Sequence, residues 1–428
     1  MADDYVIRVS NSLQDVDAAQ WDRLLASQGQ SSPFMRHAYL AALHDSGCAA
    51  AATGWILHLF TLCEGSALVA ACVVYEKSHS YGEYVFDWAW ANAYAQHGLA
   101  YYPKAVVAVP FTPVPGPRLL AGNAVHRVAL VRALERWCEQ QGLSSLHLLF
   151  ANQDDLDACA SAGLMLRHTV QFHWKNTTPG YADFDDFLMS LSQEKRKKIR
   201  QERRKVAQAG VSFRWSQGRD ITPTDWDFFY RCYERTYLEH GNAPYLNRDF
   251  FQRMADTMAD HWLLFTAERN GHPIATSLIA LDAHSTGASG QNASGDWAAV
   301  CSAQVKEEPA RRAGDTEQNA LRPSLPPEKV AYGRYWGALE RVDCLHFEAC
   351  YYQPLQWCIE HGYQSFEGGA QGEHKMARAL MPVRTSSAHW LAHPSFSDAV
   401  ARFLQREEQG VSNYLEDLSQ RNPFRNDR

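Results

Sequence analysis

A glycine-rich segment in the last quarter of the chain holds the residues best suited to chemistry. It reads Glu367-Gly-Gly-Ala-Gln-Gly-Glu-His-Lys375, so three glycines stand among two acids, a histidine and a lysine, and Arg378 follows. Glycines let backbone N–H groups approach an anion closely, and nearby cations can hold it. The alternative is an ordinary surface loop. We predict an anion- or donor-binding loop that comprises Gly368, Gly369, Gln371, Gly372, His374, Lys375 and Arg378.

A second cluster, Leu345–Gln353, includes a carboxylate and two phenols, those of Glu348, Tyr351 and Tyr352. It should lie where a strand gives way to a helix. Ligands of open α/β sheets favour the carboxyl ends of strands, and the loop after Glu367 should emerge at the same level. We therefore expect the two clusters to meet. Cys350 is better explained as a packed thiol than as a nucleophile, because nothing marks a paired base.

A basic segment lies near the middle of the chain. Residues 195–205 contain eight Lys or Arg in eleven positions, with Ile199 and Val206 as a thin apolar seam. Ser190 and Gln193 form a capping-box pattern that predicts the start of a helix, and Gly210 predicts its end. A solvated charged helix is one interpretation. The other is a stripe that binds a polyanion such as tRNA or a nucleotide-sugar diphosphate. The candidate contacts are Lys195, Arg196, Lys198 and Arg203.

The elements that position these residues occur twice. Trp137–His147 aligns without gaps on Trp357–Glu367, and Gly163–Trp174 aligns on Ala379–Trp390, with offsets of 220 and 216 residues. The first pair predicts a helix end, a glycine and a strand in each copy. Both copies also contain a strand-turn-strand hairpin, around Gly65 and around Gly271. The shared order of helices and strands predicts a tandem duplication in which mixed sheets are covered by helices, an α/β (α+β) fold.

The two copies differ at the glycine-rich loop. The position of Glu367 is occupied by His147 in the first copy, and Gly368-Gly369 becomes Leu148-Leu149. We therefore expect the acidic, glycine-rich site in the second copy only. The second copy also carries a segment, 283–328, with only four Leu, Ile, Val or Phe in 46 residues. Such a composition buries too little apolar surface to offset ordering, and we predict a disordered insertion.

Composition sets the remaining limits. The chain has 428 residues, of which 46% are apolar, and a net charge of −7. Its apolar runs are too short to span a membrane, and its first residues do not form a secretory signal. We expect a cytoplasmic protein without a transmembrane segment. The ten cysteines include no C-x-x-C pair, so no metal site is predicted. No Walker A or G-x-G-x-x-G motif occurs, which disfavours nucleotide hydrolysis and hydride transfer.

Several longer motifs are similar to one family. They are Val85–Tyr94, Tyr101–Lys104, Pro110–Leu120, Lys195–Arg204, Tyr332–Gly337, His346–Gln353 and Gly369–Lys375. Together they resemble the bacterial predicted N-acyltransferases of the FemAB-like type, over nearly the whole chain outside the insertion. The resemblance implies a tandem acetyltransferase-like (GNAT) fold, related to the Fem transferases that add amino acids from aminoacyl-tRNA to peptidoglycan precursors. The chain departs from the pattern at the insertion and at Ala379, where a glycine is expected.

The resemblance implies an N-acyltransferase that moves an acyl or aminoacyl group from acyl-CoA or aminoacyl-tRNA to an amine acceptor, such as a peptidoglycan-related precursor. Such transfer needs a base, oxyanion donors and an acid. The candidate bases are Glu348, Glu367 and Glu373, and the candidate acids are Tyr351 and Tyr352. The first copy would be a scaffold or an acceptor-binding half, with Tyr101, Lys104 and Arg118 near the site.

These inferences divide the chain into a first domain at 1–178, a basic connecting helix at 179–210 and a second domain at 211–428. The alternative function is a non-catalytic RNA- or nucleotide-binding protein. In that case the basic helix 195–205 would do the binding, and the glycine-rich loop would be structural.

Overall fold

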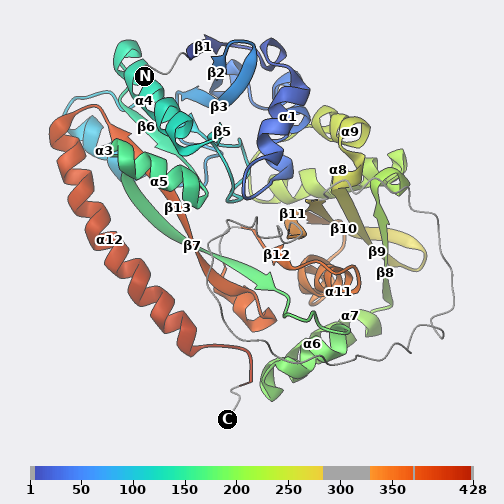
Figure 1. Ribbon diagram of the computed structural model, residues 1–428. Helices are drawn as coiled ribbons and strands as arrows, with labels where there is room; N and C mark the ends of the chain where they lie inside the picture. The colour runs from blue at the N-terminus through green and yellow to red at the C-terminus, as the bar shows by residue number, and fades with distance from the viewer. Residues whose placement is uncertain (1–4, 283–327, 370–371, 426–428) are drawn as a thin grey trace, which may run out of the picture.

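One continuous mixed β-sheet runs through the whole molecule (Figure 1). The computed structural model describes residues 5–282, 328–369 and 372–425. The described strands are ordered β1-β2-β3-β4-β6-β13-β7-β12-β11-β10-β9-β8, and a short β5 pairs with β3 beside this path. Their bounds are β1 Val6–Ser10, β2 Trp55–Glu64, β3 Ala67–Lys77, β4 Lys104–Val107, β5 Leu120–Ala121, β6 Ser145–Leu148, β7 Met165–Lys175, β8 Val211–Gln217, β9 Trp262–Arg269, β10 His272–Leu281, β11 Val330–Ala338, β12 Ser365–Glu367 and β13 Met381–Leu391.

The strand order reads almost the same from either end, as a duplication predicts, except that the last strand of each copy is exchanged. Strand β7 of the first copy pairs with β12 of the second, and β13 of the second pairs with β6 of the first. Between them β7 and β13 are antiparallel, with Thr169 opposite Thr385 and their hydroxyls 2.8 Å apart. These two residues are separated by 216 residues, the offset of the repeated segments. The pseudo-twofold axis therefore passes between them, which confirms the duplication.

Helices cover the sheet at the positions that the repeat predicts. Both copies place a helix, a glycine and a short strand in succession: α4 ends before Gly142 (φ 66°) and α11 before Gly362 (φ 67°). The helices are α1 Ala18–Ala26, α2 His37–Asp45, α3 Trp88–Gln96, α4 Ala124–Gln141, α5 Gln153–Ala162, α6 Phe184–Ser190, α7 Gln193–Gln208, α8 Pro223–Glu239, α9 Arg248–Thr257, α10 Leu345–Phe347, α11 Gln353–Glu360 and α12 Pro394–Gln420. A π-helical turn, Glu348–Tyr352, joins α10 to α11.

The predicted start of the basic helix was wrong. Ser190 is the last residue of α6, where its hydroxyl donates to the Phe187 carbonyl, and α7 begins at Gln193. Leu191 breaks the helix because it is buried and extended, and it forms an isolated bridge with Phe424. The predicted insertion lies outside the described residues up to position 327.

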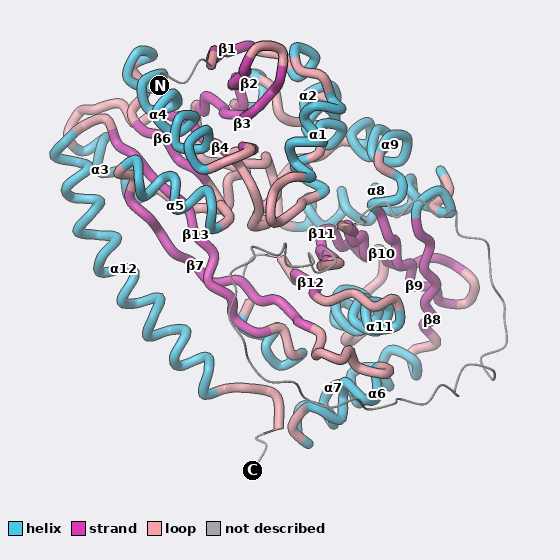
Figure 2. Tube along the Cα trace, in the orientation of Figure 1, coloured by secondary structure: helices cyan, strands magenta, loops and turns pink. Residues whose placement is uncertain are grey.

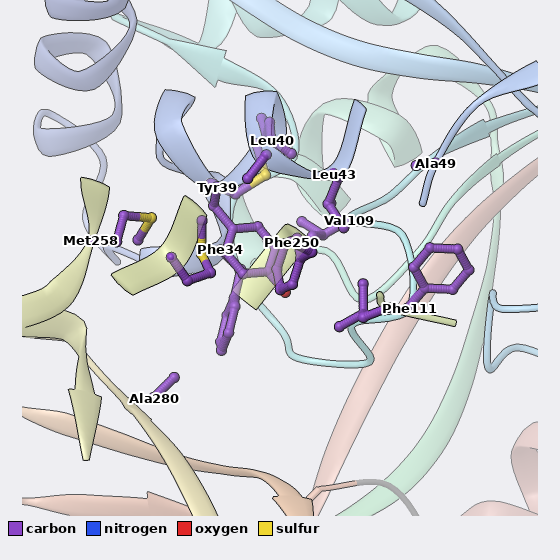
Figure 3. Close-up of a cluster of buried hydrophobic side chains, with 14 of the residues drawn as sticks. Phe34, Tyr39, Leu40, Leu43, Ala49, Val109, Phe111, Phe250, Met258 and Ala280 are labelled. Carbon is purple, nitrogen blue, oxygen red and sulfur yellow. The ribbon is translucent and has the colours of Figure 1, made fainter. Parts of the chain in front are cut away.

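An aromatic core joins the two copies (Figure 3). Phe34 and Tyr39, from the first copy, contact Tyr332 and Phe250 of the second, with ring centroids 5.2 and 5.5 Å apart. On the opposite side of the molecule, α12 lies along the exchanged ribbon of β7 and β13 (Figure 2). The ribbon and the core together hold the copies as one body, so residues of both can contribute to one site.

Candidate functional site

A cleft lies in the second copy where the pairing of the parallel strands β11 and β12 ends. They pair only at Val330–Tyr332 and Ser365–Glu367, after which β12 ends and β11 continues beside β10. Arg334 is the extra residue of a β-bulge, since Leu278 pairs with Tyr335 and Ile279 with Gly333. Bulges bend a strand and re-aim its side chains. The cleft has a volume of about 130 Å³, and its walls include Ser277, Gly333, Arg334, His346, Tyr351 and Gly368.

Two glycines shape this region. Gly337 allows close packing against α8, and Gly368 leaves space at the cleft. A Cβ atom at Gly337 would lie 1.9 Å from the Cys232 carbonyl oxygen of α8, so only glycine lets α8 approach β11. A Cβ atom at Gly368 would lie 2.4 Å from Leu380. In the first copy the residue aligned with Gly368 is Leu148, whose side chain is buried. The opening at the end of the paired strands is therefore a property of the second copy.

Glu367 lies at the end of β12 and is buried. Burial raises the pKa of its carboxyl to about 8, although the guanidinium groups of Arg334 and Arg118 act in the opposite direction. The His173 Nδ1 atom, on the exchanged strand β7, lies 3.8 Å from Glu367 Oε1, and burial lowers the pKa of this imidazole to about 4. Both groups are therefore neutral at pH 7. The Glu367 carboxyl must therefore lose its proton before it can act as a base.

Tyr351, His374 and Lys375 lie together where the predicted clusters meet. The Tyr351 hydroxyl is 3.3 Å from His374 Nε2, and Lys375 Nζ donates to the Gly369 carbonyl at 2.9 Å. Burial lowers the pKa of the Lys375 ammonium to about 8. Gly372 has a φ of 115°, and a Cβ atom there would lie 2.5 Å from the His374 ring. Gln371 lies outside the described residues.

Ala379 ends the short helix Glu373–Arg378 in a left-handed conformation, with a φ of 63°. Its repeat partner Gly163 also has a positive φ, 95°. Left-handed backbone disfavours any side chain beyond glycine. This conformation explains why glycine is expected at position 379.

A buried ion pair that the sequence did not predict connects α7 to the cleft. Glu202, on the inner face of α7, accepts hydrogen bonds from Arg378 Nη2 at 3.0 and 3.1 Å and from the Tyr352 hydroxyl. Arg378 also donates to the His374 carbonyl at 2.7 Å and lies 3.5 Å over the Phe347 ring. Glu202 shares the helix face of Ile199 and Val206. Its position among these apolar residues was the one feature of the sequence that could have indicated a buried carboxylate.

Two of the candidate bases lie away from the cleft. Glu348 faces α7, where Arg203 Nε donates to it at 3.1 Å and Gln353 at 2.7 Å. Glu373 is exposed and accepts from the Tyr414 hydroxyl at 2.8 Å and from Arg421 at 3.2 Å. Of the three candidates, the structure brings only Glu367 next to a residue that lines the cleft.

The outer face of α7 is a solvent-exposed band of cations. Lys198 is exposed, Lys195 is half-buried beside Glu194, and Arg196 contacts Met189. Arg200 pairs with Asp185 at the surface. Arg203 differs from the others, because it is directed inward to Glu348 and lies over the Phe184 ring. This exposed band leaves charge available for a polyanion.

The first-copy candidates belong to buried networks instead of the cleft. Lys104 is fully buried and binds Ser80, Glu83 and Asp87, and the Tyr101 hydroxyl donates to Asp87 at 2.6 Å. Arg118 is also buried and donates to main-chain carbonyls, with Leu149 at 3.0 Å. The structure does not bring Tyr101 or Lys104 to the second-copy site.

Within the described ranges, no group of three or more His, Cys, Asp or Glu side chains could hold a metal ion. No helix among the same residues is long and apolar enough to cross a membrane.

Comparison with known proteins agrees with this architecture. The model of the FemAB-like family, described as peptidoglycan biosynthesis or recognition, matches residues 12–286 and 311–426. The chain belongs to the FemAB-like family. None of the curated proteins matches it. The FemAB-like chain is similar to the crystal structure of FemX, with a TM-score of 0.50 and 8% identity over 90% of this chain and 98% of FemX. At that identity the likeness concerns the fold alone.

Two further solved structures cover most of this FemAB-like chain. One is the C-terminal domain of a putative lysylphosphatidylglycerol synthetase from Agrobacterium fabrum, with 11% identity, a TM-score of 0.48, and coverage of 92% of this chain and 97% of that one. The other is a tandem GNAT protein from the clavulanic acid biosynthesis pathway, with 12% identity, a TM-score of 0.43, and coverage of 91% and 99%.

Proposed function

We propose that the chain transfers an aminoacyl group from aminoacyl-tRNA to an amine of a peptidoglycan-related acceptor, and that transfer takes place in the cleft between β11 and β12. The observation that carries this proposal is the cavity at the end of the β11–β12 pairing, beside the Arg334 bulge. Beyond Tyr332, β11 has no partner strand on the side of β12 among the described strands, and we propose that backbone N–H groups on this edge bind the carbonyl oxygen of the donor. Backbone donors aimed at a developing oxyanion are a strong contribution to acyl transfer.

The neighbouring side chains supply the proton transfers. The acceptor amine attacks the carbonyl carbon of the aminoacyl ester, and the C–O bond to the tRNA ribose breaks in the second step. Glu367, once ionised, takes the proton that the amine loses. The Tyr351 hydroxyl lines the cleft and donates a proton to the leaving ribose oxygen, and His374 Nε2, 3.3 Å away, holds that hydroxyl in place. No covalent enzyme intermediate is required.

The distribution of charge favours tRNA over acyl-CoA as the donor. A larger cavity of about 740 Å³ shares Trp336 and His346 with the cleft and is bordered by the carboxylates of Glu239, Glu340 and Asp343. Two of these carboxylates pair with Arg269 and Lys205, and the cavity also contains Arg235 and Arg341. A cavity with this mixture of positive and negative side chains does not favour binding of the diphosphate of acyl-CoA. The exposed cations instead follow α7, as a nucleic-acid backbone requires.

A transfer assay tests the proposal. The full-length protein is incubated with tRNA charged with radiolabelled amino acids, or with labelled acetyl-CoA, in the presence of a peptidoglycan precursor that carries a free amine. Label should reach the precursor from tRNA, and Glu367→Gln should abolish the transfer. Arg196→Glu with Arg200→Glu should weaken tRNA binding, whereas Arg132→Glu on α4 should not. Transfer from acetyl-CoA alone, or full turnover by Glu367→Gln, would refute the assignment.

A further inference from the structure

The guanidinium of Arg334 lines the cleft with part of its hydrogen-bonding capacity unused. Arg334 Nη2 donates to the Phe111 carbonyl at 3.1 Å, and the guanidinium lies 5.3 Å from the Phe34 ring centre and 5.2 Å from that of Tyr335. Its Nε atom is buried and has no hydrogen-bond partner in the described part of the chain. The bulge in β11 therefore aims a cation into a mostly aromatic surrounding.

Three other buried arginines have a carboxylate or several carbonyl acceptors, although Arg378 Nε also has no hydrogen-bond partner among the described residues. Arg378 binds the Glu202 carboxylate, Arg127 Nε lies 3.0 Å from Asp155, and Arg118 donates to three main-chain carbonyls. Removing an ion from water costs several kcal/mol unless a counter-charge or hydrogen bonds compensate. The Glu367 carboxyl is close enough to Arg334 to interact with it electrostatically, but burial raises the pKa of this carboxyl to about 8 and keeps it protonated at neutral pH. Among the described residues, no ionised carboxylate therefore pairs with Arg334, and its positive charge is available to a bound group.

We propose that Arg334 binds a carboxylate of the acceptor, so that the acceptor is an amino acid or short peptide whose carboxylate lies close to the amine that is acylated. This inference rests on the proposed function, because it assigns the cleft to amine and acyl groups. The planar guanidinium matches the geometry of a carboxylate. A cavity of about 130 Å³ accommodates such a small group. The reacting end of the donor is a neutral ester and offers no anion.

Calorimetric titration of the full-length protein without any donor tests this inference. The two probes are glycylglycine and glycylglycinamide, which have the same amine and differ in the carboxylate. We expect the wild type to bind glycylglycine at least about tenfold more tightly, as for a charge-assisted pair. Arg334→Gln should remove this preference, and Arg334→Lys should retain part of it. Arg132→Gln, an exposed arginine paired with Glu135 on α4, is the matched control and should behave as wild type.

Equal binding of the two probes, no binding of either, or a preference that survives in Arg334→Gln would overturn the inference. Melting temperatures of the variants show whether each one is folded. If Arg334→Gln does not fold, Arg334→Lys decides, because it keeps the charge but loses the planar fork, and an unchanged preference would then show that Arg334 does not hold the carboxylate. Since no donor is present, a retained preference without aminoacyl transfer would refute the proposed function only. Transfer without any preference would refute the inference only.

Discussion

The buried pair between Glu202 and Arg378 makes a quantitative prediction about stability. Glu202 is 8% exposed and Arg378 is 3% exposed, and the Tyr352 hydroxyl also depends on Glu202 as its acceptor. Glu202→Ala leaves a guanidinium buried without its counter-charge, which typically costs about 3–5 kcal/mol. The orphaned Tyr352 hydroxyl adds roughly 1 kcal/mol. We therefore expect the variant to lose about 4–6 kcal/mol of its free energy of unfolding.

Urea denaturation, followed by tryptophan fluorescence and far-UV circular dichroism, measures this loss, provided that the two transitions coincide. Glu373→Ala is the matched control. It removes a carboxylate from the short helix Glu373–Arg378, which carries Arg378, but the Glu373–Arg421 pair is about half exposed on both sides. Exposed pairs contribute between about 0 and 1 kcal/mol. The double variant Glu202→Leu with Arg378→Met should recover most of the loss, because apolar residues of similar size can replace a buried pair. A loss in Glu202→Ala no greater than in Glu373→Ala would refute the reasoning.

Three further predictions follow from single positions. Burial raises the pKa of Glu367 from its ordinary value of 4.5 to about 8. Between these pH values the folded protein keeps a proton that the unfolded chain has lost. The free energy of unfolding therefore falls as pH rises through that range. Glu367→Gln should therefore gain in melting temperature relative to wild type between pH 5 and about pH 9, and a constant difference would contradict this. Gly337→Ala should cost at least about 3 kcal/mol or prevent folding, because its Cβ would lie 1.9 Å from a backbone oxygen of α8, and normal denaturation would contradict the packing. Lys104→Met should destabilise by about 3–5 kcal/mol, since Glu83 and Asp87 lose their cation; a change in acceptor KM with unchanged stability would instead restore Lys104 as a binding residue.

Much of the fold could be predicted because its signals are local. The hairpins β2–β3 and β9–β10 follow from two strand-forming runs around a glycine turn, and the helix, glycine and strand pattern recurs at Gly142 and Gly362. Thr169 and Thr385 are separated by the repeat offset of 216 residues, but only the pairing of β7 with β13 shows that they face each other on the axis. The repeat could not predict the exchange of β7 and β13. The sequences of these strands are compatible both with pairing inside their own copy and with pairing to the other copy.

The site was harder to predict because it depends on which face each residue takes. The Leu345–Gln353 cluster was expected to act together, but the π-helical turn directs Tyr351 to the cleft and Glu348 to α7. Lys104 stood in a motif, yet nothing in the sequence showed that Glu83 and Asp87 pack around it. Arg334 stood in the Tyr332–Gly337 motif without an assigned role. Its bulge became visible only from the pairing of β10 with β11.

The exchange of strands explains how two similar copies yield one open cleft. His147 and Glu367 occupy equivalent positions, and each contacts a histidine from the exchanged strand: His147 Nδ1 lies 2.7 Å from His389, and Glu367 lies 3.8 Å from His173. In the first copy Leu148 follows and fills the space, whereas Gly368 leaves it open in the second. The first copy nevertheless contributes His173 to the second-copy site and the Phe111 carbonyl to Arg334. A separated second copy would lack both groups, so the duplication is part of the site itself.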